Sequence, residues 1–291
     1  MSRYQAQLLP DGRRLHLHDG PIDLVIEAEG ERPAVHAAYE AAERRFATIL
    51  DELCGELVLL RQPTAKKPNG ITAQLMWQAT LPFAEECFIT PMAAVAGSVA
   101  EEILAAMTQV ADLERAFVNN GGDIALHLAP GSSFRIGLID RPDQPSLFGT
   151  AEVGEEDRVR GIATSGWRGR SFSLGIADAV TVLAESASRA DAAATVIAND
   201  VDLPGHPSIT RIPACDIQPD NDLGMRKVTR GVGALSMDEI SRALSRGLRT
   251  AQQLMDRGLV TAAALHLKGE TRIVGNYRAS RAEMSRIAIH A

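Results

Sequence analysis

The spacing of apolar residues alternates between two periods along this 291-residue chain, and that alternation constrains the fold more than any other feature. Apolar side chains recur every three or four residues over 33–60 and about 91–110, which predicts amphipathic helices. Between 113 and 184 the interval drops towards two, which predicts strands over 116–118, 124–128, 134–139, 158–162 and 179–183. The last third predicts helices over 187–199 and 237–256, with strands near 209–217, 226–233 and 260–267.

Strand blocks that alternate with long helices are typical of the α+β class. We expect a largely antiparallel sheet, covered on one side by the helices. The chain is long enough for a single domain over 1–291 with a sizeable core. The order of helix, strand block, helix and strand block also permits two similar α+β halves, about 1–130 and 131–275, followed by a short tail at 276–291.

Two local signals predict where elements begin. Asp19-Gly20-Pro21 is a turn-forming tripeptide between two apolar runs, and it predicts a hairpin over 13–29. Ser236 precedes the helix at 237–256, and Glu239 follows it by three residues, which is the pattern of a capping box. Both signals are independent of the apolar periodicity and agree with it.

Composition limits the kinds of partner. The net charge of −7 argues against a nucleic-acid surface spread over the whole protein. Cys54, Cys87 and Cys215 lack the spacing of a metal site and are too few for a disulfide framework, which fits a reducing compartment. The chain lacks the ~18 to 20 unbroken apolar residues of a membrane span, and its first residues lack the apolar stretch of a signal peptide. We therefore expect a cytoplasmic protein that binds neither nucleic acid nor membrane.

The first of three short motifs is Asn119-Asn120-Gly121-Gly122-Asp123, which follows an apolar run. Gly121 and Gly122 have no Cβ, so the backbone there can take positive φ and approach a ligand closely. Asp123 could accept a hydrogen bond from a ribose hydroxyl. The alternative is a tight hairpin turn between two strands, and from this motif alone the turn is the better interpretation.

The second motif is Thr164-Ser165-Gly166, which follows the apolar pair Ile162-Ala163. Hydroxyl and backbone N–H groups at the end of a strand can bind an anion. Arg168 and Arg170 follow, and they could neutralise phosphate charge. A polar loop with solvated arginines explains the same residues equally well.

The third motif places Asp191 and Thr195 four residues apart on the helix predicted over 187–199. That spacing puts the carboxylate and the hydroxyl on one face of the helix, one turn apart. Both are hard oxygen donors of the kind that Mg²⁺ binds together with water and substrate phosphates. The alternative is that Asp191 is a first-turn acid favoured by the helix dipole, with Ser188 as the cap.

Two further groups of residues are open to more than one interpretation. Cys215, in Pro213-Ala214-Cys215-Asp216, could be a reactive thiol or a buried cysteine. Asp216, Asp220 and Asp222 form an acidic loop that could bind a cation or be a solvated turn. The buried cysteine and the solvated turn are the simpler interpretations.

Together, in this order, the motifs resemble those of the ApbE family of flavin-handling proteins. The similarity covers roughly residues 90–200. That family has a helix, a Gly-Gly-Asp turn, a strand, a Thr-Ser-Gly loop, a Val-Thr-Val strand and an Ala-Asp-Ala-x-x-Thr helix. The matching segments here are 93–107, 120–123, 134–140, 164–166, 180–182 and 190–195.

The resemblance implies a ligand and a reaction. In that family, the aspartate and threonine that match Asp191 and Thr195 hold magnesium, the magnesium engages the diphosphate of FAD, and FMN is transferred to a protein threonine. It therefore implies FAD or FMN as cofactor, Mg²⁺ at Asp191 and Thr195, and an ApbE-like fold of the T-fold type. The residues it places around the ligand are Asn120, Gly121, Gly122, Asp123, Thr164, Ser165 and Gly166.

The chain also differs from the transferase of that family. The His-x-Ile-Asp-Pro-x-x-Gly segment of the transferase has no counterpart in residues 167–179, and the last ninety residues differ from its tail. The chain is therefore more similar to an uncharacterised ApbE-like branch. No catalytic residue is identified.

Three hypotheses for the function follow. The first is an ApbE-like protein that binds a flavin or another nucleotide diphosphate with magnesium, with FMN transfer to an acceptor protein as the implied reaction. The second is a non-catalytic module that holds a flavin or a partner protein in a redox or sulfur-metabolism pathway. The third is thiol chemistry at Cys215. By analogy with other sheet-and-helix folds, we expect a homodimer.

Overall fold

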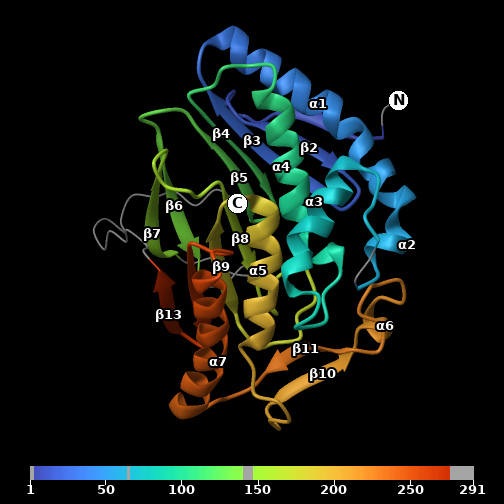
Figure 1. Cartoon of the computed structure of the whole chain (residues 1–291), viewed down its shortest axis with the longest axis vertical. Helices are drawn as coiled ribbons and strands as arrows, with labels where there is room; N and C mark the ends of the chain where they lie inside the picture. The colour runs from blue at the N-terminus through green and yellow to red at the C-terminus, as the bar shows by residue number, and fades with distance from the viewer. Residues whose placement is uncertain (1–2, 64–65, 140–146, 276–291) are drawn as a thin grey trace.

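The computed structural model describes residues 3–63, 66–139 and 147–275. They contain a nine-stranded sheet in the order β1-β2-β3-β4-β5-β8-β9-β12-β13, and every pair of neighbouring strands in it is antiparallel (Figure 1). The predicted α+β class, with a largely antiparallel sheet covered by long helices, is confirmed. Asp140, which ends one of the quoted segments, and the predicted tail at 276–291 lie outside the described residues.

The sheet contains two groups of strands with the same order along the chain. In the first group two strands, helices and two more strands follow one another, and the second group repeats this order. The division into two similar halves itself stays a prediction. The first group is β2 (Leu15–Asp19), β3 (Ile22–Glu29), β4 (Arg115–Asn120) and β5 (Asp123–Leu128), with β1 (Gln5–Leu8) at its edge. The second is β8 (Gly161–Ser165), β9 (Ala179–Ala184), β12 (Ala262–Leu267) and β13 (Glu270–Gly275).

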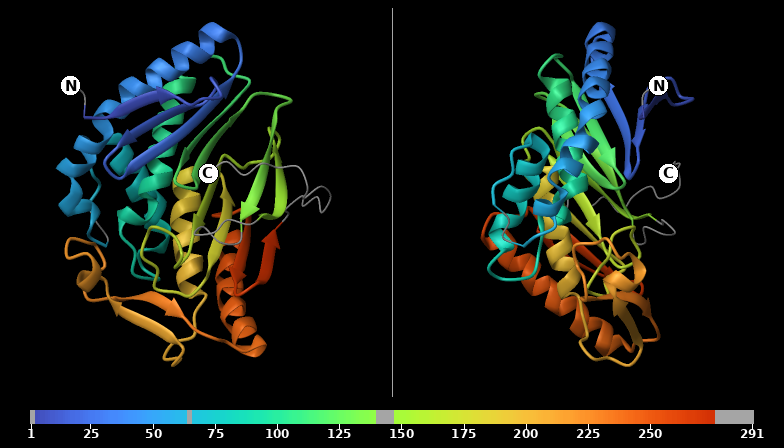
Figure 2. Two further views of the ribbon diagram at one scale, coloured as in Figure 1. Left: turned by 180° about the vertical axis from the view of Figure 1, so that it is seen from behind. Right: turned by 90° about the vertical axis from the view of Figure 1, so that its right-hand side faces the viewer.

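The long helices lie on one face of the sheet, as the edge-on view of Figure 2 shows. Four of them, α1, α4, α5 and α7, pack directly against the strands, whereas α3 packs against α4 and α5. In α7, for example, Ile240, Leu244 and Leu254 are buried. None of the described helices is long and apolar enough to cross a membrane. The long helices are α1 (Arg32–Gly55), α3 (Ile71–Thr80), α4 (Val95–Thr108), α5 (Ala187–Asp200) and α7 (Met237–Asp256), and the short ones are α2 (Leu57–Leu60), η1 (Leu81–Phe83), η2 (Pro91–Ala94) and α6 (Ala214–Ile217).

Two hairpins lie outside the main sheet. The hairpin of β6 (Ser133–Ile139) and β7 (Leu147–Gly154) covers part of the other sheet face, where Phe134 and Val153 join a cluster with Leu126 and Leu183. The second hairpin consists of β10 (Ile209–Pro213) and β11 (Lys227–Val232). Apolar layers therefore lie on both faces of the sheet around β5, β8 and β9.

Several predicted boundaries were wrong. The helix predicted over 33–60 ends at Gly55 and a separate short helix follows, while the strand predicted near 209–217 ends at Pro213, which begins the turn of α6. The strand predicted over 158–162 starts only at Gly161 and runs on to Ser165. Five elements were not predicted, namely β1, α3, η1, β7 and β13.

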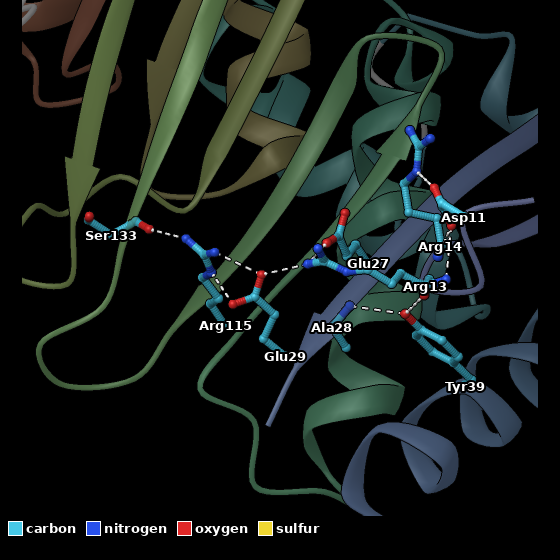
Figure 3. A network of polar contacts seen from close by, with 9 residues as sticks. All are labelled: Asp11, Arg13, Arg14, Glu27, Ala28, Glu29, Tyr39, Arg115 and Ser133. Atoms are coloured by element: carbon cyan, nitrogen blue, oxygen red, sulfur yellow. Dashed lines mark hydrogen bonds and ion pairs between the residues drawn. The ribbon is translucent and has the colours of Figure 1, made fainter. Parts of the chain in front are cut away.

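A network of paired charges lies over β3 and β4 (Figure 3). The Arg115 guanidinium donates to both carboxylate oxygens of Glu29, at 2.8 and 2.7 Å. Arg13 donates to Glu27 at 2.6 Å and to Glu29 at 3.2 Å. The Arg115 hydrogen bonds lower the pKa of Glu29. In this group, called the polar cluster below, every acid has a guanidinium partner.

Candidate functional site

A cavity of about 880 Å³ lies where β5 and β8 separate. These strands pair at only two positions, Ile124 with Ile162 and Ala125 with Gly161. Beyond them the Asp123 carboxylate accepts a hydrogen bond from the Thr164 backbone N–H at 3.1 Å, so a side chain continues the ladder where the backbone no longer does. The cavity opens at this break in the sheet.

All nine residues predicted for the site line this one cavity. They come from three places: the β4–β5 turn, the end of β8, and one face of α5. The structure therefore brings the three motifs together, while the role of each residue stays a prediction. The nine residues are Asn120, Gly121, Gly122, Asp123, Thr164, Ser165, Gly166, Asp191 and Thr195.

The β4–β5 turn is both a hairpin turn and a wall of the cavity. Gly121 and Gly122 have φ of +65° and +110°, which suits glycine in a two-residue hairpin connection. Asn119 Oδ1 accepts from the Gly122 N–H at 2.8 Å and holds the turn closed. Asn120 donates from Nδ2 to the Ala96 carbonyl at 3.1 Å, so its amide ties the turn to the start of α4.

The segment at the end of β8 is held in place by the buried carboxylate of Asp178. Asp178 accepts from Trp167 Nε1 at 3.1 Å, from Arg168 Nε at 2.6 Å and from the Lys268 backbone N–H at 2.6 Å. A Cβ on Gly166 would lie 2.6 Å from the Asp178 carbonyl oxygen, so only glycine fits there. Asp178 therefore positions the Thr-Ser-Gly segment without being part of the cavity wall.

Thr164 uses both of its polar groups within the protein. Its backbone N–H donates to Asp123, and its hydroxyl shares a hydrogen bond of 2.9 Å with the hydroxyl of Thr181. Ser165 and Thr195 line the cavity, and neither hydroxyl hydrogen-bonds to a described residue. These two hydroxyls are the ones most available to a ligand.

Asp191 is not a first-turn acid, and Ser188 is not the helix cap. Ser186 caps α5, and Asp191 lies in the second turn; the Ser188 hydroxyl donates to Glu101 at 2.7 Å. Asp191 Oδ2 instead accepts from the backbone N–H of Gly97 at 3.0 Å, at the start of α4. The interpretation of Asp191 as a first-turn acid with Ser188 as the cap was therefore wrong. The hydrogen-bond partner of Asp191 lies on another helix, which the local sequence does not indicate.

Gly97 allows this contact between helices. A Cβ there would lie 2.3 Å from the carbonyl oxygen of Ala187 and 3.0 Å from Cβ of Asp191. The start of α4 can therefore approach α5 this closely only with glycine. The sequence motifs gave no sign of this requirement.

Asp123 and Asp191 form a pair of carboxylates in the cavity wall. Desolvation raises the pKa of Asp191 to about 7, against the opposing effect of the Gly97 and Ala96 backbone N–H groups. Desolvation also raises the pKa of Asp123 well above its ordinary value, and the charge of Asp191 raises it further. Arg170 acts in the opposite direction on Asp123. The sequence predicted both residues, but not that they would lie close enough to interact.

The remaining acids of the cavity wall are Asp220 and Asp222, from the acidic loop for which a solvated turn was the simpler interpretation. Asp220 forms an ion pair with Arg61, and Asp222 accepts from the hydroxyl of Thr90. Both acids line the cavity. This loop is therefore part of the site and is attached to two distant segments.

Cys215 does not line the cavity. Its thiol is half-exposed, with Sγ 3.4 Å from Met225 Sδ, so the expected buried cysteine is wrong. Among the described residues that line the cavity there is no histidine, cysteine or lysine. The described residues also contain no cluster of three or more His, Cys, Asp or Glu side chains of the kind that holds a metal ion.

A comparison with known families and proteins gives these matches. A family model described as "AbpE bacteria" matches residues 6–273. A UPF0280 protein of Methanopyrus kandleri is 44% identical over 129 residues, which cover 44% of this chain and 48% of that protein. A UPF0280 protein of Methanothermobacter thermautotrophicus is 41% identical over 154 residues, 51% of this chain and 56% of that protein. The chain thus spans about half the length of the curated relatives it matches.

Among solved structures, the flavinyl transferase ApbE of Pseudomonas stutzeri in its apo form gives a TM-score of 0.49 at 12% identity. That match covers 94% of this chain and 93% of the other.

Proposed function

This chain belongs to the family described as "AbpE bacteria", and we propose that its cavity binds a flavin or another nucleotide diphosphate together with Mg²⁺. Membership confirms the resemblance to ApbE-like proteins, and the UPF0280 relatives agree with an uncharacterised branch. The observation that carries the proposal is the pair Asp123 and Asp191. Two carboxylates in one cavity wall repel each other, and a bound cation would remove that repulsion.

The donor set fits magnesium. Asp191 and Thr195 lie one turn apart on α5, and Asp123 faces them from the start of β5. Two carboxylates and a hydroxyl are hard oxygen donors, and Mg²⁺ usually takes one or two carboxylates and completes its octahedron with water and phosphate. When bound, it would neutralise charge on the diphosphate. The absence of histidine and cysteine among the described cavity residues disfavours zinc.

The rest of the cavity suits a ligand of nucleotide size. Its volume of about 880 Å³ is within the range of pockets that enclose small-molecule ligands. The β4–β5 turn and the hydroxyl of Ser165 would lie near the phosphates. Phe88 and Phe172 line the wall. The guanidinium of Arg226 lies 3.3 Å from the ring centroid of Phe88, so Phe172 is the better placed ring for stacking on a flavin or a base.

Transfer of FMN to an acceptor protein is the reaction that this ligand would allow. The hydroxyl oxygen of an acceptor threonine would form a bond to the FMN phosphorus of FAD, the bond between the two phosphates would break, and AMP would leave. The acceptor must also lose a proton. That proton would pass to the phosphate of the departing AMP or to solvent.

A second candidate function is a non-catalytic module that holds a flavin or a partner protein, in a redox or sulfur-metabolism pathway. One observation favours it. The described cavity residues include no imidazole, thiol or amine that could serve as a conventional base or nucleophile. Such a module would retain flavin without releasing AMP.

Absorbance spectroscopy tests the binding proposal. The protein is mixed with FAD and Mg²⁺, free ligand is removed, and the retained flavin is measured before and after EDTA. We expect flavin to be retained by the unaltered protein, lost on chelation and reduced at least tenfold in Asp191→Asn. Asp216→Asn is the control, because Asp216 is an exposed aspartate outside the cavity wall.

The outcomes separate the candidates. Retained flavin with AMP release in the presence of a threonine peptide supports the transferase, and retained flavin without AMP supports the module. No retained flavin in the unaltered protein would contradict both flavin proposals. Equal retention by Asp191→Asn and Asp216→Asn would remove the metal role of Asp191.

A further inference from the structure

Two arginines follow the Thr-Ser-Gly segment, but they have different surroundings. Arg168 donates from Nε to Asp178 at 2.6 Å, and its guanidinium lies 4.4 Å from the ring centroid of Trp167. Arg168 is therefore already paired with other residues of the protein. The exposed side chain of Arg170 makes no hydrogen bond or ion pair with any residue in 3–63, 66–139 and 147–275. Arg170 is therefore the one of the two that can change partner.

The guanidinium of Arg170 lies directly against the β4–β5 turn. Its Nη2 is 1.9 Å from the position that a Cβ on Gly121 would occupy, so only glycine leaves room for it there. Both residues line the cavity. Arg170 is also near enough to Asp123 for its charge to act on that carboxylate. Arg170 thus places a positive charge at the cavity wall, near Asp123, without a hydrogen bond or ion pair to the described residues.

We propose that the Arg170 guanidinium supplies positive charge beside Asp123 in the ligand-free protein. When a metal ion binds Asp123 and Asp191, the guanidinium moves to a phosphate of the ligand. This inference rests on the proposed function, because it assumes a metal and a phosphate in the same cavity. A guanidinium has the planar set of N–H donors that matches a phosphate. Arg170 is then the residue that couples metal binding to phosphate binding.

The inference makes two predictions of opposite sign. A metal ion that binds alone meets the positive charge of Arg170, so removal of that charge strengthens its binding. A metal ion that binds with a diphosphate leaves Arg170 paired with the phosphate, so removal of the charge weakens binding. A residue that only maintained the fold would not change the two affinities in opposite directions.

Binding calorimetry with Mn²⁺ as the metal probe tests this. Mn²⁺ is titrated alone, then with inorganic pyrophosphate, into the full chain and into Arg170→Ala and Arg170→Lys. For Arg170→Ala we expect Mn²⁺ alone to bind about three- to tenfold more tightly and pyrophosphate with Mn²⁺ to bind at least tenfold more weakly. Arg170→Lys keeps the charge, so Mn²⁺ alone binds unchanged and pyrophosphate binding falls by about three- to tenfold.

Gly121→Ala is the matched positional variant. Its methyl group displaces the guanidinium and keeps the charge, so it should weaken pyrophosphate binding and leave the thermal unfolding curve cooperative. The inference is overturned if Arg170→Ala leaves both affinities unchanged or weakens both. Failure of FAD to bind, with pyrophosphate binding and its Arg170 dependence intact, would contradict the flavin proposal alone. Failure of both Mn²⁺ and pyrophosphate to bind the unaltered chain would overturn both.

Discussion

The polar cluster of Figure 3 and the cavity lie on the same sheet, but the pKa values of their acidic side chains are shifted in opposite directions. In the cluster, Glu29 receives two hydrogen bonds from Arg115, and its pKa is lowered. In the cavity, Asp191 receives backbone hydrogen bonds but no guanidinium, and desolvation raises its pKa to about 7. The first acid is stabilised by the folded protein itself. The second is held in a place that disfavours its charge.

The partners of an acidic side chain distinguish a structural charge from a functional one. A carboxylate that is paired with a guanidinium has its charge balanced by the protein and requires no ligand, and such exposed pairs are common on protein surfaces. Two desolvated carboxylates with raised pKa values, such as Asp123 and Asp191, reduce the stability of the metal-free protein when they are charged. Retaining them is reasonable if a ligand provides the missing positive charge.

The largest effect concerns metal affinity. The double variant Asp123→Asn with Asp191→Asn should lower the affinity for Mg²⁺ by about 100-fold or more, because both charged donors are lost. Glu29→Gln in the polar cluster should leave it unchanged. Isothermal titration calorimetry at pH 8 measures both. Equal affinities for the two variants would erase the contrast between the regions.

The next effect concerns the contact between α4 and α5 that positions Asp191. Gly97→Ala should lower the free energy of unfolding by about 2 to 3 kcal/mol, because its methyl group would meet the Ala187 carbonyl. Gly55→Ala is the matched control, since a Cβ at the end of α1 meets nothing within 4 Å. Urea denaturation gives both values. A Gly97→Ala protein as stable as Gly55→Ala would contradict the close crossing.

A smaller effect concerns pH. The pKa of Asp191 in the folded protein lies above its unfolded value of 3.8, so the folded state binds the proton more tightly. Its contribution to stability is complete below about pH 4 and is lost as the pH rises to about 7. Asp191→Asn keeps an acceptor for the Gly97 N–H and should stabilise the metal-free protein at pH 8 by about 1 to 2 kcal/mol. Thermal unfolding in EDTA measures this; destabilisation by Asn would show that the charge is not costly.

The smallest effect is on the free energy of unfolding when Glu29 of the polar cluster is replaced, and its sign is opposite to that expected for Asp191→Asn. The lowered pKa of Glu29 means that its stabilising contribution is present above about pH 4.5 and is lost as the pH falls. Glu29→Gln should therefore destabilise the protein at pH 8 by about 0.5 to 1 kcal/mol and have little effect at pH 3. The same unfolding series provides the values. Stabilisation by this variant would place Glu29 with the cavity acids.

Much of the fold could be predicted because its signals are local. The helix expected over 237–256 has the predicted bounds. Its start is marked by Ser236 and Glu239, which form both hydrogen bonds of the capping box. The hairpin predicted over 13–29 is present as β2 and β3. By contrast, α3 begins after Gly70 with no side-chain cap, so no local signal marks its start.

The site was predictable in its residues but not in its geometry. The order of the three motifs along the chain was enough to collect nine residues that line one cavity. The meeting of Asp123 with Asp191 depends on the separation of β5 from β8 and on the close approach of α4 to α5 at Gly97. Neither is encoded in a local pattern. For the same reason the sequence could not separate Arg168, which is bound to Asp178, from Arg170.

In the proposed function, Asp123 and Asp191 together bind a divalent metal ion. Mg²⁺ titration at pH 6, 7 and 8, in buffers of different ionisation enthalpy, tests it most directly in the unaltered chain and in Asp191→Asn. Because the pKa of Asp191 is about 7, we predict that affinity rises about tenfold from pH 6 to pH 8 and that about one proton is released on binding at pH 6. Asp191→Asn should bind Mg²⁺ more weakly and show a smaller dependence on pH, because only Asp123 still titrates. Mg²⁺ binding that is independent of pH and unchanged in Asp191→Asn would contradict the claim.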